Sequence, residues 1–150
     1  MLTRTTSSIA IAATLIAGLA AGCGSSNSNS TSTAALSKAA FLAKANAICK
    51  QGNQKQSAAQ QALGKSPTQA QITSFVTATA IPNIQAQIVQ IRALGAPSGD
   101  QAKVTSMLAL AQVDLNKVKS DPTLLTSGNQ FANFAAVAHP YGLTSCAAGS

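Results

Sequence analysis

Apolar residues recur at helical spacing over most of the chain beyond residue 37. Four segments carry apolar side chains three or four residues apart, the spacing of one face of an α-helix. The stripes are Phe41, Ala45, Ile48, Gly52, Ala59 and Leu63; Ile72, Val76, Ala80, Ile84, Ile88 and Ile91; Val104, Leu108, Ala111, Leu115 and Val118; and Phe131, Phe134, Ala135 and Ala138. Four amphipathic segments with short connections predict an all-α fold, a small up-and-down bundle of about four helices.

Capping signals predict where these helices begin and end. Ser37 and Gly64 are the expected caps of a helix over residues 38–63. Capping boxes, in which Ser is followed three residues later by Gln, are expected to open the next three helices at residues 66–69, 98–101 and 127–130. Leu143–Cys146 is then expected to return as a tail.

Two stretches complicate this pattern. Pro82 interrupts the second stripe, because proline lacks an N–H and its ring clashes with the carbonyl four residues earlier. The segment is therefore either one kinked helix or two short ones. The Gln-rich residues 51–61 are weakly apolar, so this part of the first helix is expected to project beyond the core.

The first 22 residues have the organisation of an export signal. Arg4 places a positive charge beside the amino terminus, and residues 9–21 (IAIAATLIAGLAA) form a mainly apolar segment. That segment is too short to cross a bilayer as a helix, which takes about 20 residues, and small residues follow it as at a signal-peptidase site. Residues 1–22 are therefore predicted to be removed on export.

The cleavage region, Leu19-Ala20-Ala21-Gly22-Cys23, resembles the lipobox of bacterial lipoproteins, which ends in small residues and a Cys. Ala20 stands where that motif commonly has Leu. The resemblance implies that Cys23 becomes the mature N-terminus and carries a thioether-linked diacylglycerol, which would anchor the protein to the outer side of a cell membrane. The alternative is ordinary cleavage, since Ala20 and Gly22 also satisfy the general signal peptidase.

The remaining cysteines fit an exported chain. After Cys23, residues 24–33 (GSSNSNSTST) cannot bury apolar surface, so residues 23–36 are expected to be a flexible linker. Cys49 and Cys146 are left as the one available pair, and paired thiols form disulfides in an oxidising compartment. The expected domain covers residues 37–146, with a tail at 147–150.

The charge balance is strongly basic and suggests an anionic neighbour. The chain has 10 Lys and Arg against 3 acidic residues, a net charge of +7, and such an excess attracts anions at long range. Five lysines lie early in the domain and are the candidate binding residues for an anionic envelope polymer or an envelope protein: Lys38, Lys44, Lys50, Lys55 and Lys65. Alternatively, they are a solvated helix face. Nucleic acid is not expected, because no basic run is interleaved with aromatic residues.

The acidic residues have plain structural explanations. Asp100 is expected in the first turn of a helix, where its charge suits the helix dipole. Asp114 is expected to form a surface pair with Lys117, and Asp121 is expected to cap the turn that begins at Pro122. No pair of carboxylates is placed for acid and base catalysis.

His139 is the only candidate general base, and its place near a helix C-terminus is explained by the helix dipole. With Cys49 and Cys146 it would give zinc too few ligands. We therefore expect no enzyme activity, no metal site and no cofactor other than the covalent lipid on Cys23.

A second resemblance covers residues 38–146. Residues 45–49 (ANAIC), 94–97 (LGAP) and 141–146 (YGLTSC) are similar to the two ends and the middle loop of small exported domains of high-GC Gram-positive bacteria. This resemblance implies the helical fold and the disulfide, but no activity. Two functions stay open: a non-catalytic envelope module for an anionic partner, and a carrier that holds an apolar ligand between its helices.

Overall fold

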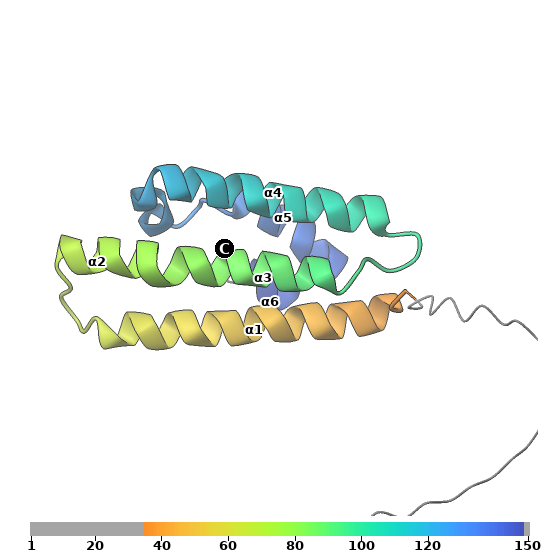
Figure 1. Ribbon diagram of the computed structural model, residues 1–150, viewed down its shortest axis with the longest axis horizontal. Helices are drawn as coiled ribbons and strands as arrows, with labels where there is room; N and C mark the ends of the chain where they lie inside the picture. Colours follow the sequence, from red (N-terminus) through yellow and green to blue (C-terminus); the bar gives the residue numbers. More distant parts are fainter. Residues whose placement is uncertain (1–34, 149–150) are drawn as a thin grey trace, which may run out of the picture. The chain divides into compact units, whose positions relative to one another are not determined.

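The predicted amphipathic segments form the helices of an up-and-down bundle in a computed structural model that describes residues 35–148 (Figure 1). Its elements are α1 (Lys38–Ala62), α2 (Gln69–Phe75), the π-helical η1 (Val76–Ala80), α3 (Ile81–Ala93), α4 (Gln101–Ser120), the 3-10 helix η2 (Pro122–Ser127), α5 (Ala132–Tyr141) and α6 (Thr144–Ala147). The described residues contain no strand. The predicted all-α bundle of about four helices is confirmed. The predicted signal segment, Cys23 and most of the linker lie outside the described residues.

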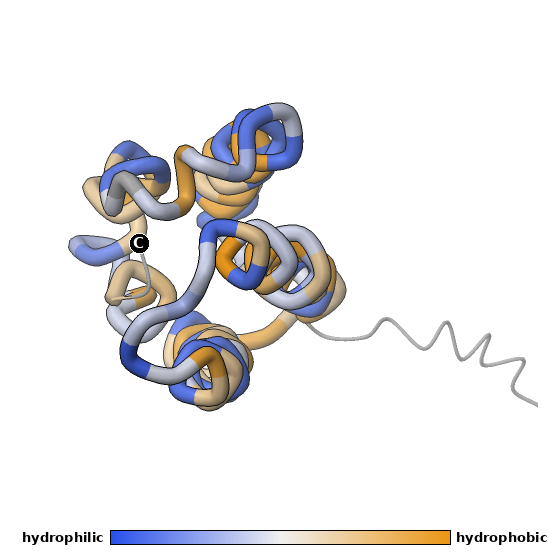
Figure 2. Tube along the Cα trace, turned by 90° about the vertical axis from the view of Figure 1, so that its left-hand side faces the viewer, coloured by the Kyte–Doolittle hydropathy of each residue, from blue (hydrophilic) through white to orange (hydrophobic). Residues whose placement is uncertain are grey.

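The helices close into a ring around one core. α3 packs between α1 and α4, α5 packs on α4, and the single-turn α6 contacts both α5 and α1. Viewed along the bundle axis, the helices stand around a common centre (Figure 2). The predicted stripes supply that centre, with Phe41, Ala80, Leu115 and Ala138 buried from four different elements.

The helix that contains Pro82 is continuous, because the backbone widens just before the proline. In a regular α-helix the ring of Pro82 would meet the carbonyl of Ala78. Instead, the N–H of Ile81 donates to the carbonyl of Val76, five residues back, which is the π-helical spacing of η1. The kinked-or-split alternative is therefore settled as one helix with a π-turn, and α2 and α3 run on in line in Figure 1.

The predicted capping box at Ser66 is wrong by two residues. The N-cap of α2 is Thr68, whose Oγ1 accepts from the Gln71 N–H at 3.3 Å while the Gln71 Oε1 accepts from the Thr68 N–H at 2.8 Å. Residues 66–69 and 68–71 both match the capping pattern. The helix begins at the second match.

The other two predicted boxes are also wrong. α4 begins after Asp100, which makes no capping hydrogen bond with its side chain. Residues 122–127 form η2, which ends at Gly128 with a φ of 86° that suits glycine, and α5 begins only at Ala132. At the end of the chain, the expected tail includes one further helical turn, α6.

The Gln-rich part of α1 does not project beyond the bundle. Gly52 is buried, and the Asn83 Nδ2 of α3 donates to its carbonyl at 3.0 Å. Ala59 and Leu63 pack against the core further along. The expectation was wrong because the small Gly52 and Ala59 side of α1 lets α3 and η1 pack close to it. A helix face with few large apolar side chains can therefore still be buried.

The predicted disulfide between Cys49 and Cys146 is present and joins α1 to α6 across 97 residues of sequence. Two side chains of α1 flank it on the same helix face. Asn46 accepts from the Ser145 N–H at 2.9 Å and donates to the Gly142 carbonyl at 2.8 Å, and Asn53 donates to the Ser145 carbonyl at 2.8 Å. We call this set of bonds between α1 and residues 142–146 the staple.

Loss of the disulfide is expected to destabilise the whole bundle. The Cys49→Ser/Cys146→Ser variant should lose about 2–5 kcal/mol of unfolding free energy, because a long loop is no longer closed in the unfolded chain. Guanidinium unfolding followed by far-ultraviolet circular dichroism measures this, with Cys23→Ser as the control that keeps the bridge. A loss below about 0.5 kcal/mol would contradict the role assigned to the staple.

Candidate functional site

A wide hollow lies at the end of the bundle where α1 ends and α2 begins, the end that is at the left of Figure 1. We call it the end cleft. It has a volume of about 490 Å³. Its apolar lining residues are Leu63, Pro67, Ile72, Phe75, Val76, Leu125 and Phe131, and its polar ones are Gln56, Gln60, Thr126 and Gln130, with Gly128 between them. Hence it offers apolar walls and neutral hydrogen-bonding groups, and none of its lining residues is titratable.

The end cleft exists because the helices differ in length. α1 has 25 residues and α4 has 20, whereas α5 has only 10. At 1.5 Å per residue, α5 is shorter than α4 by roughly 15 Å. Beyond the start of α5, the side of the bundle is closed only by η2 and residues 128–131, which leaves a hollow against α1 and α2.

A smaller hollow of about 60 Å³, also partly open, lies next to the end cleft. Gln56 and Phe131 line both hollows. The smaller one is also lined by Ile88, Leu108 and the disulfide-bonded Cys49 and Cys146. Its volume is that of roughly two water molecules. Its lining is mainly apolar, and the amides of Asn53, Gln56 and Gln87 also contribute to it.

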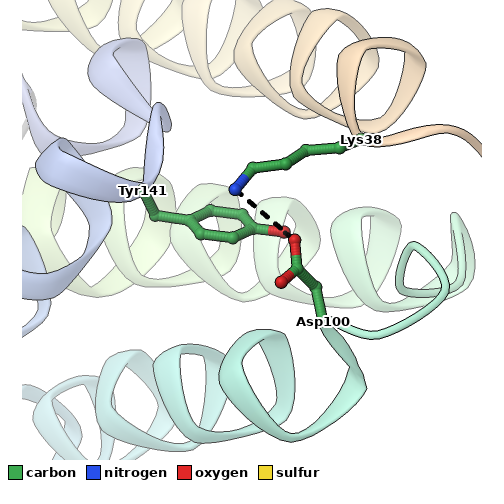
Figure 3. Close-up of polar contacts among 3 residues, drawn as sticks. All are labelled: Lys38, Asp100 and Tyr141. Carbon is green, nitrogen blue, oxygen red and sulfur yellow. Dashed lines mark hydrogen bonds and ion pairs between the residues drawn. The ribbon is translucent and has the colours of Figure 1, made fainter.

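A polar cluster occupies the opposite end of the bundle, where α1 begins (Figure 3). The Tyr141 hydroxyl donates to Asp100 Oδ2 at 2.8 Å, and Lys38 Nζ lies 3.5 Å from the same oxygen. Lys38 Nζ also lies 4.4 Å from the centre of the Tyr141 ring, and Lys103 Nζ lies 5.8 Å from it. The carboxylate of Asp100 therefore interacts with Tyr141 and Lys38, and it does not cap the first turn of α4.

Both acidic groups of the cluster titrate away from their ordinary ranges. The hydrogen bond from Tyr141 lowers the pKa of Asp100 below its usual 3.8, partial burial opposes that shift, and Lys38 and Lys103 lower the pKa further. Burial, followed by the hydrogen bond and the charge of Asp100, raises the pKa of Tyr141 to about 12. The stabilisation from Asp100 is therefore present above about pH 4 and is lost as the pH falls through its lowered pKa.

Asp114 is not the surface residue that the sequence predicted. It is 2% exposed, its Oδ1 lies 3.1 Å from Lys117 Nζ, and its Oδ2 has no hydrogen-bond partner among the described residues. The predicted pair with Lys117 exists. However, α4 packs against α3 on one side and against α5 and η2 on the other, so it buries a wider arc than its apolar stripe covers. Asp121 does cap η2, accepting from the Thr123 N–H at 3.0 Å.

The five candidate lysines are all exposed, but they do not share one surface. Successive residues of an α-helix turn by about 100°, so Lys38, Lys44 and Lys50 point in three directions roughly 120° apart, and only Lys44 and Lys55 share a side of α1. Lys65 lies in the connection after α1. Lys38 alone among them forms an ion pair within residues 35–148. His139 is exposed in the last turn of α5.

Sequence reasoning missed two features that the fold creates. The end cleft depends on where α5 begins, which the false capping box at residues 127–130 obscured. The contact between Asp100 and Tyr141 spans 41 residues of sequence, so no local sequence pattern could predict it. Asn46 and Asn53 could have been found, because they stand three residues before and four after Cys49, on the same helix face.

The phenol of Tyr141 is expected to ionise at an unusually high pH. The chain has one Tyr and no Trp, so its near-ultraviolet absorbance reports this group alone. The folded protein should titrate with a pKa of about 12, against about 10 for the unfolded chain, and its stability should fall as the pH rises from 10 to 12.

In Asp100→Ala the tyrosine pKa should fall but stay above 10, because the burial remains. Asp121→Ala, at the other end of α4, is the matched control and should leave the titration unchanged. Titration of the folded wild-type protein at about pH 10 would be incompatible with the geometry of Figure 3.

Comparison with known proteins adds no further function. No protein-family model, curated protein or solved structure matches the chain. Within residues 35–148, no helix is long and apolar enough to cross a membrane. Over the same residues, no three His, Cys, Asp or Glu side chains are grouped so that they could hold a metal ion.

Proposed function

We propose that the protein is a lipid-anchored, extracytoplasmic module without catalytic activity that binds an apolar or amphipathic molecule in the end cleft. The observation that carries the proposal is the cleft itself, a hollow of about 490 Å³ with apolar walls and neutral polar groups. Ligand sites for small molecules have volumes of about 300–1,000 Å³ and this mixture of lining groups.

The lining chemistry favours one type of ligand. Gln56, Gln60 and Gln130 offer amide donors and acceptors, whereas the cleft has no charged side chain to neutralise an ionic head. A molecule with a neutral hydrogen-bonding head and an apolar body therefore matches it best. The adjoining small cavity, which Phe131 also lines, would accept the tip of an apolar chain.

The arrangement of the lysines supports the cleft over the five-lysine surface as the ligand site. Lys38, Lys44 and Lys50 face different sides of α1, so they would have to meet a partner that wraps around the helix. The end cleft, in contrast, gathers side chains of α1, α2, η1, η2 and the start of α5 around one volume. Binding there should be largely insensitive to salt, because no ion pair is involved.

The proposed location is the outer side of a cell membrane. The Cys49–Cys146 disulfide is consistent with an oxidising, extracytoplasmic compartment. Lipidation of Cys23 would hold the domain there through two acyl chains, which suffice for stable anchoring at about 0.8 kcal/mol per buried methylene. The linker of about a dozen residues would let the domain reach roughly 20 Å from its anchor.

The anchor is tested by the intact mass of the protein extracted from the membranes of its host. We expect a chain that begins at Cys23, carries the added mass of a diacylglyceryl group, and gains two hydrogens on reduction of the disulfide. The Cys23→Ser variant should be released without lipid. A wild-type chain that begins elsewhere or carries no lipid would overturn the anchoring part of the proposal.

The cleft is tested with the neutral apolar fluorophore N-phenyl-1-naphthylamine, which brightens in an apolar site. The wild-type chain should bind it saturably at one site, with little dependence on salt. In Ile72→Trp the indole should fill the cleft and weaken binding about tenfold or more, a loss of about 1.4 kcal/mol.

Val89→Trp is the matched control, because Val89 is 51% exposed on α3 and does not line the cleft. Circular dichroism should show both variants to be folded. Equal binding by the wild-type protein and Ile72→Trp would remove the cleft as the ligand site.

A further inference from the structure

We infer that the opposite end of the bundle, around Lys38 and Lys103, is a surface that docks on the anionic headgroups of a phospholipid membrane. The inference shares with the proposed function only the location at a membrane, and it concerns different residues. We call this surface the basic groove. It has a volume of about 380 Å³, and its lining includes Lys38, Lys103, Met107, Val137 and Tyr141.

The two ammonium groups of the basic groove are held in place before any partner binds. Lys38 Nζ and Lys103 Nζ lie 4.4 Å and 5.8 Å from the centre of the same Tyr141 ring, within the range of cation–π attraction. The ring is itself fixed by its hydrogen bond to Asp100. Binding an anionic headgroup to both lysines therefore costs less side-chain conformational entropy.

Charge favours an anionic partner at this place. Asp100 is the one carboxylate of the cluster, and it faces two lysines. Arg92, exposed in the last turn of α3, adds a third cation at this end of the bundle. The Lys38 side chain remains 51% exposed despite its ion pair, so it can still contact a headgroup.

The apolar part of the groove favours a lipid surface over a free polymer. Val137 is 39% exposed, one of the few large apolar side chains that the described domain presents to solvent. Pro140 lies beside it at the groove, and both adjoin Tyr141. Exposed lysines beside exposed aliphatic groups match the chemistry of a bilayer interface, where cations meet phosphates and apolar groups meet the glycerol region.

The covalent connection of the chain points to the same partner. The described chain starts at residue 35, and α1 begins three residues later at Lys38. The described chain therefore begins at the same end of the bundle as the basic groove. If Cys23 is anchored as proposed, this end of the bundle is the one nearest the bilayer. α1 is roughly 37 Å long at 1.5 Å per residue, so docking here would turn the end cleft away from the membrane.

The test is co-sedimentation of the lipid-free Cys23→Ser chain, without its signal segment, with vesicles. One preparation is an equimolar mixture of phosphatidylglycerol and phosphatidylcholine, and the other is phosphatidylcholine alone. We expect binding to the anionic vesicles only, weakening as salt is added. Since each lysine near an anionic surface contributes about a fivefold gain in affinity, Lys38→Gln/Lys103→Gln should lose roughly 25-fold.

Lys44→Gln/Lys55→Gln removes the same charge from positions of α1 that do not line the basic groove, and it should lose far less. Lys103→Gln/Arg92→Gln leaves the ion pair of Lys38 and Asp100 intact. It should lose affinity as Lys38→Gln/Lys103→Gln does, and such a loss cannot be attributed to a fold weakened by removal of that ion pair. Equal losses in all three pairs, or no binding to anionic vesicles, would overturn the inference. Fluorophore binding in the end cleft is measured without vesicles, so the two proposals can fail separately.

Discussion

The attachment of α6 to α1 is the constraint on which the rest of the domain depends. α6 has four residues, too few to hold a helical conformation by itself. It stays in place because the Cys49–Cys146 disulfide and the hydrogen bonds of Asn46 and Asn53 bind it to the middle of α1. Since α6 also packs on α5, this staple joins the last helix of the bundle to the first and closes the ring.

Both candidate sites follow from that closure. Asn46 holds the carbonyl of Gly142, which directly follows α5, so the staple fixes the position of Tyr141 and with it the cluster of Lys38 and Asp100. Gly142 itself has a φ of 109°, and a Cβ there would lie 2.9 Å from Leu42 Cδ1, so only glycine fits this turn well. Because its C-terminal end is held in place, the 10-residue α5 begins well short of the C-terminal end of α4, and the end cleft is the space that remains.

The helix faces and the cysteine pair were predictable, because both depend on local spacing or on simple pairing. The buried Phe41, Val76, Leu115 and Phe134 lie on the predicted stripes. Helix boundaries were less predictable: Ser66 and Thr68 both match a capping box, and the sequence does not show that Thr68 is the one that caps α2. Asp114 was misjudged because burial depends on how many neighbours a helix has, which no single segment reveals. The contact of Asp100 with Tyr141 and the end cleft arise between distant segments, and they required the fold.

The central claim is that the domain is built to hold a small apolar or amphipathic molecule at the end remote from its N-terminal connection. Native mass spectrometry of the protein extracted from its host tests this most directly, since the mass of any non-covalent ligand is read with its stoichiometry. The account predicts a wild-type protein that carries one such molecule, and an Ile72→Trp protein from the same host without it. A wild-type protein that is free of ligand, or one whose ligand persists in Ile72→Trp, would contradict the claim.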